Sequence, residues 1–336
     1  MGAEKLDFTR LMGLAGGHSE ARAIQTALKL GFFEALLLGP RDADALAGAV
    51  HCERRATMLL ANALVALRVL RKNGEQYGLA DEAHRFLLKG SPEYLGDMIL
   101  FDEALWSTWG KLDESIRSGR PARAPDMYQS QPDETDRFIR AMDSLVRARG
   151  DAVWTAQNLD LSWARTVADL GGGPGTYMVE FLRRWPNLRG ILFDLPATLQ
   201  VTRRILHERG PLQERLTLNE LDYKRGEIPG PLDVIFMSNI IHSEDEAVNS
   251  LLIAKSFRAL APGGLLVIKD HIMDSDLTVP AAGAIFSLYL LLTINGRDYS
   301  LDEVTKWLRD AGFSDVLLET LPSPPFSSSM VLARKP

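Results

Sequence analysis

A glycine-rich turn near the middle of the sequence has the composition of a ligand-binding loop. Asp169 is followed by Gly171, Gly173 and Gly175 at alternating positions, between the apolar run VADL and the amphipathic segment YMVEFLRRW. Glycines after the first strand of a parallel sheet let the backbone approach a ligand closely, in the crevice where open α/β sheets bind ligands. A dinucleotide fingerprint requires a third Gly or Ala where this sequence has Thr176, so NAD is disfavoured. The alternative is a turn without a ligand, in which Asp169 only serves the loop.

Two further acidic residues follow the next two predicted strands. Asp194 ends the second strand, in Phe193-Asp194-Leu195-Pro196, where a carboxylate can accept hydrogen bonds from both ribose hydroxyls. Asp222 and Tyr223 end the third strand and offer an acceptor and a flat side chain to an adenine. S-adenosylmethionine has an ammonium group and no phosphates, so this order of acceptors favours it. The predicted cofactor-binding residues are Asp169, Gly171, Gly173, Asp194, Leu195, Asp222, Tyr223 and Ser238.

His242 is the histidine best placed to act as a base. It follows the apolar run LDVIFMSNII, at the carboxyl end of the predicted sheet, where ligands bind in open α/β folds. Histidine titrates near neutral pH, so its imidazole can remove a proton from a hydroxyl. The alternative is a histidine that only packs or caps a helix. The other five histidines lack this placement and are predicted to be structural: His18, His51, His84, His207 and His271.

These side chains need a sheet that brings the ends of several strands together. From Arg165 onward, helical segments alternate with short strand-like runs: RTVADL, RGILFDLP, LTLNELD, LDVIFMS, GLLVIKD, DVLLETL and SSMVLAR. Such alternation implies βαβ units and a sheet with helices on both faces. We therefore predict an α/β fold, with a Rossmann-like, mostly parallel, seven-stranded sheet.

The N-terminal part of the sequence predicts a helical domain. Apolar residues recur at helical spacing from Leu6 to about Leu100, and Asn73-Gly74 is a hairpin-turn signal after two helices. Helix, turn, helix and hairpin describe a winged helix, but the helix that would enter a DNA groove is apolar between its basic ends, which favours burial against a partner. The predicted domains are an all-α winged-helix-like dimerisation domain (1–100), a helical linker that contributes to the substrate pocket (101–160) and a catalytic domain (161–336).

Composition narrows the class of partner. A chain of 336 residues with 46% hydrophobic and 24% charged residues suits two globular domains. A net charge of -6 disfavours a nucleic-acid ligand. The single cysteine, Cys52, fits a reducing compartment and removes thiolate zinc sites, and we expect no metal. The N-terminus lacks the pattern of a secretory signal, and the apolar stretch 281–294 is shorter than the roughly 20 residues of a membrane span. We expect a cytoplasmic protein without a membrane partner.

Five motifs together resemble one enzyme family. DLGGGPG, FDLP, the Asp222-Tyr223 pair, NIIHSED and APGGLLVIKD look like the small-molecule O-methyltransferases that include plant caffeate and bacterial polyketide O-methyltransferases. The similarity spans nearly the whole chain, because the N-terminal half also matches in layout. The resemblance implies a class I methyltransferase that uses S-adenosylmethionine and releases S-adenosylhomocysteine, a homodimer with intertwined N-terminal halves, and catalysis by His242 on a hydroxylated acceptor.

The same resemblance assigns two carboxylates beside the histidine. In the family, two acidic residues flank it, and they map to Asp270 in VIKD and Asp298 in NGRDYS. The family usually has Glu at both positions, and its histidine is commonly followed by Asp-Trp where this chain has Ser243-Glu244. The alternative for Asp270 is a strand-end residue that faces water. These departures keep open a second hypothesis, in which the fold binds S-adenosylmethionine but catalyses decarboxylation, hydroxylation or a pericyclic reaction.

The substrate pocket is predicted from two apolar helical segments. Phe138, Met142 and Leu145 share one helix face, at spacings of 4 and 3. The second segment contributes Phe286, Leu288, Tyr289 and Thr293. Core packing explains each residue alone, but as a set that matches the family's pocket they imply a flat aromatic or polyketide-like acceptor. A third hypothesis, a winged-helix transcription factor with a ligand-sensing half, is disfavoured by the acidic charge.

Overall fold

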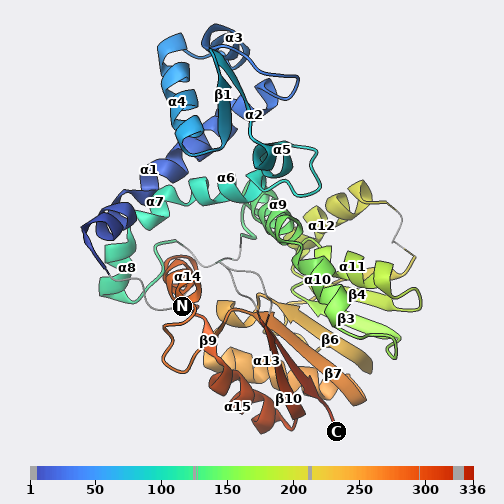
Figure 1. The fold of residues 1–336 in the computed structure, drawn as a ribbon. Helices are drawn as coiled ribbons and strands as arrows, with labels where there is room; N and C mark the ends of the chain where they lie inside the picture. The colour runs from blue at the N-terminus through green and yellow to red at the C-terminus, as the bar shows by residue number, and fades with distance from the viewer. Residues whose placement is uncertain (1–5, 124–125, 127, 211–213, 295, 321–328) are drawn as a thin grey trace. The chain divides into compact units, whose positions relative to one another are not determined.

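The computed structural model describes residues 6–123, 126, 128–210, 214–294, 296–320 and 329–336. It contains two compact units, whose elements are labelled in Figure 1. The first unit comprises the residues up to Ala104 together with Ser144–Gly150, and the second comprises Leu105–Asp143 and the residues from Asp151 onward. The predicted domain boundaries at residues 100 and 160 stay a prediction, since compactness alone does not show which segment folds independently.

The first unit consists of helices and one hairpin. Its elements are α1 (Phe8–Leu30), α2 (Phe32–Ala35), α3 (Ala43–Ala49), α4 (Arg54–Ala66), β1 (Leu70–Asn73), β2 (Gln76–Leu79), α5 (Asp81–Leu87) and α6 (Gly96–Ala104). Asp7, Asp42 and Glu53 begin α1, α3 and α4 by accepting hydrogen bonds from backbone N–H groups that the helix leaves unpaired. As predicted, the chain reverses after Asn73, where Gly74 has a φ of 57°.

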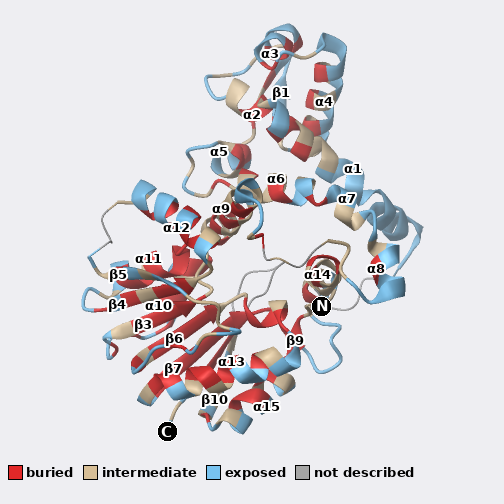
Figure 2. Cartoon of the chain, turned by 180° about the vertical axis from the view of Figure 1, so that it is seen from behind, coloured by how far each residue is buried: buried red, intermediate tan, exposed pale blue. Residues whose placement is uncertain are grey.

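Apolar side chains of this unit are divided between a core and an exposed helix face. Its core includes the fully buried Phe32, Phe33, Leu46 and Leu64. The first half of α1 is different, because it is exposed along its length (Figure 2). Its large apolar side chains are at least half exposed: Phe8, Leu11, Met12 and Leu14.

The second unit contains the predicted seven-stranded sheet, which confirms the Rossmann-like fold class. Its strand order is β10-β11-β7-β6-β3-β4-β5. The strands are β3 (Thr166–Leu170), β4 (Arg189–Asp194), β5 (Leu216–Glu220), β6 (Leu232–Ser238), β7 (Leu260–Asp270), β10 (Ser314–Thr320) and β11 (Ser329–Arg334). All pairs from β7 to β5 are parallel, and β10 and β11 join antiparallel. Leu170 pairs with Met237 and Ser238 with Lys269, so the carboxyl ends of β3, β6 and β7 meet at one edge.

Helices cover both faces of this sheet (Figure 1). They are α10 (Asp151–Asn158), α11 (Thr176–Arg184), α12 (Pro196–Glu208), α13 (Glu246–Ala259) and α15 (Leu301–Ala311). Leu252 of α13 and Trp307 of α15 share a buried cluster with Leu170 of β3, whereas Phe181 of α11 contacts Phe236 on the opposite face of β6 with ring centroids 5.1 Å apart. Burial on both faces explains why the central strands read as continuous apolar runs.

The remaining elements of the second unit lie outside the main sheet. They are α7 (Trp106–Trp109), α8 (Leu112–Ser118), α14 (Ala281–Thr293) and the short parallel pair β8 (Ile272–Met273) and β9 (Tyr299–Ser300). Helix α9 (Pro132–Arg149) belongs to the second unit up to Asp143 and to the first unit beyond it. Among the described residues, no helix combines the length and the apolar composition needed to cross a bilayer.

Candidate active site

The glycine turn connects β3 to α11 by a backbone path that side chains would obstruct. Gly171 has a φ of 66°, and a Cβ placed on it would lie 2.3 Å from Ile240 Cδ1. The N–H of Gly171 donates to the carbonyl of Phe193 at 2.8 Å, which ties the turn to the end of β4. Gly173 also has a positive φ, of 51°, but a Cβ there would meet no atom within 4 Å. The turn is therefore packed against the protein at Gly171 and open at Gly173.

Asp194 organises the side of this turn that faces β4. Its Oδ2 accepts a hydrogen bond of 2.8 Å from the N–H of Gly173, and its Oδ1 accepts one of 2.7 Å from the N–H of Leu195. Desolvation raises the pKa of Asp194 to about 6, although these two N–H groups and Thr198 oppose the rise. Near neutral pH the side chain is therefore mostly an anion. Each carboxylate oxygen has a second lone pair that can accept another hydrogen bond.

Asp169, at the end of β3, is a buried carboxyl group with an unpaired oxygen. The residue is 2% exposed, and its Oδ2 has no hydrogen-bond partner among the described residues. Burial raises the pKa of Asp169 to about 8, and the nearby charge of Asp194 adds to the rise. Because unpaired buried polar groups are costly and rare, this oxygen marks a place for a hydrogen-bond donor or a cation.

Glu244 anchors Tyr223 and Lys224, the two residues that follow Asp222. The hydroxyl of Tyr223 donates to Glu244 Oε1 at 2.7 Å, and Lys224 Nζ lies 2.8 Å from Glu244 Oε2. Burial, and then the charge of Glu244, raise the pKa of Tyr223 well above its ordinary value, so its hydroxyl stays protonated. Asp222 accepts from the N–H of Lys224 at 3.0 Å. Ser238, at the end of β6, accepts from the Asn239 amide at 3.2 Å. The cofactor roles of Asp222, Tyr223 and Ser238 stay predictions.

His242 and Asp270 form a direct pair. His242 lies in a 3-10 turn, Ile241–Ser243, after β6, and Asp270 ends the neighbouring strand β7. The Nδ1 atom of His242 lies 2.6 Å from Asp270 Oδ1, and both side chains are buried. An ionised carboxylate only accepts hydrogen bonds, so Nδ1 carries the proton and the neutral ring keeps its lone pair on Nε2. Among the described residues, nothing bonds to Nε2, which leaves it able to accept a proton.

Opposing effects act on the titration of this pair. Burial by itself lowers the pKa of an imidazole, but the charge and hydrogen bond of Asp270, with a smaller contribution from Asp298, outweigh it and raise the pKa of His242. Burial also opposes the ionisation of Asp270, yet His242 holds the pKa of that carboxyl below its usual range. Asp270 therefore stabilises the imidazolium that forms when His242 takes up a proton.

Asp298 does not pair directly with His242. It lies beside His271, whose Nδ1 is 3.5 Å from Asp298 Oδ2, a distance too long for a good hydrogen bond. His242, Asp270 and Asp298 each offer an atom within 4.8 Å of the others, a spacing at which a cation could bind. Asp270 Oδ1, however, is already committed to His242 Nδ1 and to the N–H of His271. The arrangement suits proton handling better than metal binding.

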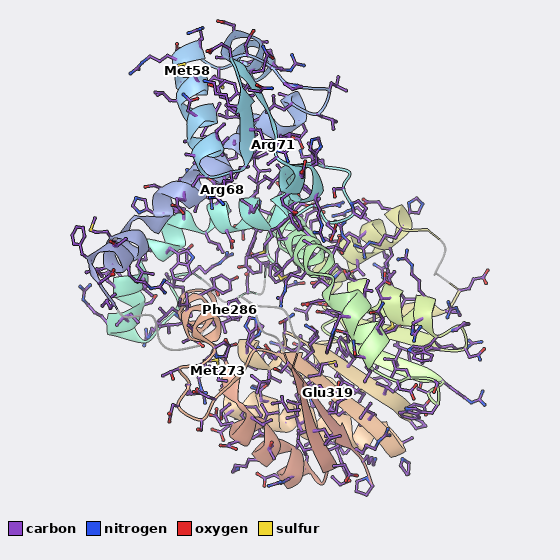
Figure 3. The ribbon with its side chains drawn as sticks, in the orientation of Figure 1. Met58, Arg68, Arg71, Met273, Phe286 and Glu319 are labelled. Atoms are coloured by element: carbon purple, nitrogen blue, oxygen red, sulfur yellow. The ribbon has the colours of Figure 1, made fainter. Side chains whose placement is uncertain are left out.

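Three of the predicted pocket residues, Phe138, Phe286 and Tyr289, belong to a series of aromatic rings in contact, called here the aromatic array. Phe286, on α14 (Figure 3), contacts His242 edge-on with centroids 5.1 Å apart and stacks on Tyr289 at 5.3 Å. The Tyr289 hydroxyl lies 3.2 Å from that of Tyr128, whose ring stacks on Phe138 at 4.4 Å. This array connects α14 to α9.

Three other predicted pocket residues lie outside this array, and the pocket roles of Phe138, Phe286 and Tyr289 stay predictions too. The hydroxyl of Thr293 donates to the carbonyl of Tyr289 at 2.8 Å, so it is used within its own helix. Met142 is partly buried in the second unit. Leu145 belongs to the first unit. The pocket roles of all three stay predictions.

Sequence reasoning missed three residues of this site: Tyr128, Glu244 and His271. His271 follows Asp270 at the end of a strand, the same placement that singled out His242, so the signal was present. Glu244 stands where the family has another residue and was noted only as a departure. No local pattern distinguishes Tyr128, because the hydroxyl that it meets, on Tyr289, is 161 residues away in the sequence.

Family profiles match both parts of the chain. A profile described as an O-methyltransferase domain matches residues 109–314, and one described as an O-methyltransferase dimerisation domain matches residues 12–89. The 3-hydroxy-5-methyl-1-naphthoate 3-O-methyltransferase of Streptomyces sahachiroi is 30% identical to this chain, over 94% of this chain and 92% of that protein.

Solved structures share the fold over nearly the full length. Human N-acetylserotonin methyltransferase in complex with SAM has a TM-score of 0.87 at 24% identity, and the match covers 100% of this chain and 99% of that one. At this identity the likeness shows the fold alone. PigF with SAH also has a TM-score of 0.87, at 25% identity, and the match covers 98% of this chain and 100% of that one.

The His242–Asp270 pair predicts a measurable titration. The Cε1 proton signal of His242 should titrate in NMR spectra with a midpoint above the ordinary value of about 6.5. In Asp270→Asn, burial remains while the stabilising charge is lost, so the midpoint should fall below that value. Asp310→Asn, which changes an exposed carboxylate on α15, is the charge-matched control and should leave the midpoint in place. An equal midpoint in parent and Asp270→Asn would contradict the pairing.

Proposed function

Because the chain belongs to the O-methyltransferase family, we propose that it transfers the methyl group of S-adenosylmethionine to a hydroxyl of a small aromatic or polyketide-like acceptor, with His242 as the general base. The observation that carries the proposal is the buried His242–Asp270 pair, whose Nε2 is left to accept a proton. This pair lies at the same sheet edge as the glycine turn.

The glycine turn fits S-adenosylmethionine in two respects. The open space over Gly173 lets a ligand approach the backbone, and the Asp194 carboxylate beside it can accept the ribose hydroxyls. The unpaired oxygen of Asp169 suits the ammonium group, whose charge would favour the ionised form of that buried carboxyl. The PigF relative was solved with SAH, the product that methyl transfer leaves.

The protein's part in the reaction is to position the acceptor and to move one proton. S-adenosylmethionine supplies a methyl group on a positively charged sulfur. The acceptor oxygen attacks the methyl carbon, and the electron pair of the broken carbon–sulfur bond stays on sulfur. His242 takes the hydroxyl proton on Nε2, and Asp270 stabilises the imidazolium through Nδ1. The buried position of both side chains keeps water from competing for that proton.

An aromatic acceptor fits the side chains around the base. Phe286 lies against His242, Tyr289 and then Tyr128 continue the array from it, and rings of this kind stack on planar ligands. The Streptomyces sahachiroi relative is named for action on a hydroxylated naphthoate, which is such a molecule. Together they support a small hydroxylated aromatic as the acceptor class.

Asp194→Ala tests the assignment of the cofactor site. Calorimetry should show that the parent protein binds S-adenosylhomocysteine with a dissociation constant on the order of micromolar. Loss of a charged acceptor for two hydroxyls should weaken binding by about 10- to 100-fold. Glu180→Gln, on α11 and in an exposed ion pair with Arg183, is the matched control. Equal binding by the parent and Asp194→Ala would refute the ribose assignment.

His242→Ala tests the chemistry. Single-turnover methyl transfer from labelled S-adenosylmethionine should slow by about 100- to 10,000-fold, while the affinity for S-adenosylhomocysteine stays near that of the parent. Across phenols of graded acidity, the loss should shrink as acidity rises, because an acceptor that is already ionised needs only positioning.

His207→Ala, which changes an exposed histidine on α12, is the control. A loss that is constant across the phenols would make His242 a positioning residue instead of a base. If the protein bound S-adenosylmethionine but methylated no hydroxylated acceptor, the non-methylating hypothesis would replace this proposal.

The dimerisation profile supports a homodimer as the working form. The exposed apolar side chains of α1, including Phe8 and Leu11, have the character of a surface that a second copy covers. Light scattering at micromolar concentration should give the mass of two chains, and the double variant Phe8→Asp/Leu11→Asp should shift it toward one. Leu38→Asp, at an equally exposed position outside α1, should not. A parent protein of monomeric mass would refute the proposal.

A further inference from the structure

His271 and Asp298 form a second histidine–carboxylate pair beside the first. His271 follows Asp270 at the end of β7, and Asp298 precedes β9, the strand that pairs with β8. The imidazoles of His271 and His242 have centroids 6.3 Å apart and planes inclined by 27°. The reaction proposed above uses His242 and Asp270 and assigns no task to this second pair.

The second pair has buried polar atoms that the fold leaves unsatisfied. His271 Nδ1 and both carboxyl oxygens of Asp298 are buried and lack hydrogen-bond partners among the described residues. His271 Nδ1 lies 3.5 Å from Asp298 Oδ2. Burial, first of all, raises the pKa of Asp298, and the His271 side chain counters part of the rise. Native cores pair nearly all their buried polar groups, so packing alone does not explain three unpaired polar atoms in one place.

The second pair also faces the aromatic array that holds the acceptor. Phe286 meets His271 edge-on at 4.9 Å and His242 edge-on at 5.1 Å, with the same interplanar angle of 83° in both contacts. One aromatic side chain therefore covers both imidazoles. The two imidazole centroids are 6.3 Å apart, a separation that one substituted aromatic ring can bridge.

From this geometry we infer that His271, oriented by Asp298, binds a second oxygen of the acceptor, on the ring carbon beside the hydroxyl that is methylated. This inference rests on the proposed function and narrows its substrate class to aromatics with two adjacent oxygen substituents. An imidazole can donate to a carbonyl or accept from a hydroxyl, so either oxygen fits. His271 is then a specificity residue that touches the acceptor, and Asp298 is a positioning residue that acts through it.

A comparison of acceptors tests the inference. The parent protein and variants would be given 2-naphthol, 2,3-dihydroxynaphthalene and 2,6-dihydroxynaphthalene, with kcat/KM expressed per hydroxyl. For the parent, the 2,3 compound should exceed the other two by about 10- to 100-fold, the range expected for a site that bonds a substrate hydroxyl. His271→Leu should reduce this ratio to about 1 to 3, because the remaining contacts are shared by all three acceptors.

Variants of the carboxylate and of the base separate specificity from stability. Asp298→Asn, in which the side chain keeps nearly the same shape, should lower the preference for the 2,3 compound less than His271→Leu does. The double variant should lower it no further than His271→Leu alone, because the two side chains act as a unit. His242→Ala should slow methylation of all three acceptors, while a preference for the 2,3 compound remains. His207→Leu, at an exposed position, is the matched control. Thermal unfolding of each variant shows whether it is folded. If His271→Leu does not fold, the acceptor ratio of Asp298→Asn tests the inference in its place.

The outcomes distinguish this inference from the proposed function. If the parent methylates 2-naphthol as well as the 2,3 compound, the inference is overturned while the proposed function stands. An unchanged ratio in folded His271→Leu also overturns it. If the parent methylates other phenols but none of the three, the inference is overturned and the proposed function stands; if it methylates no phenol at all, the proposed function fails and the inference fails with it. A preference for the 2,3 compound that disappears in His271→Leu supports both.

Discussion

The carboxylate of Asp270 is fully buried at the end of β7, and three donors converge on it. Its Oδ1 accepts from the ring of His242 and from the N–H of His271, and its Oδ2 lies 3.4 Å from the N–H of His242. One side chain thus fixes the turn after β6 relative to the end of β7, together with the orientation of the imidazole. The Asn249 amide donates to the carbonyl of Ile241 and the Tyr299 hydroxyl to that of Glu244, so both side chains also fix this turn. The free nitrogen of His242 owes its position to this set of bonds.

The buried charges of the second unit fall into two classes. Lys269 and Asp151 are both nearly inaccessible, and their charged groups lie 3.3 Å apart, so each compensates the other. Asp169 and Asp298 are also buried, but one carboxyl oxygen of Asp169 and both of Asp298 have no hydrogen-bond partner in the described part of the chain, and burial raises the pKa of both. A fold under selection for stability alone would pair or replace such groups. Their position at the edge where β3 and β7 end is the position at which open α/β sheets bind ligands.

The departures from the family pattern are accommodated by contacts elsewhere in the site. Asp270 is one methylene shorter than Glu, yet it reaches His242 at 2.6 Å because the turn Ile241–Ser243 lies directly against the end of β7. Glu244 does not face the reacting centre through its carboxylate, which binds Tyr223 and Lys224. The residues after the histidine therefore anchor the loop that follows β5, and the loop that carries the base gains a second support.

Local pattern was enough to determine the seven strands, the glycine turn and the placement of Asp169, Asp194 and His242, because strand periodicity and glycine chemistry act over a few residues. The helical character of the N-terminal part and its hairpin followed from the same rules. Contacts between distant segments could not be read this way. Asp270 lies 28 residues from His242, and only parallel pairing of β6 with β7 brings them together. Likewise, the family resemblance assigned Asp298 to the surroundings of His242, and only the path of the chain through β8 and β9 brings it within 4.8 Å of His242 and places it 3.5 Å from His271. Carboxylate partners depend on side-chain directions at strand ends, and those are decided by tertiary packing.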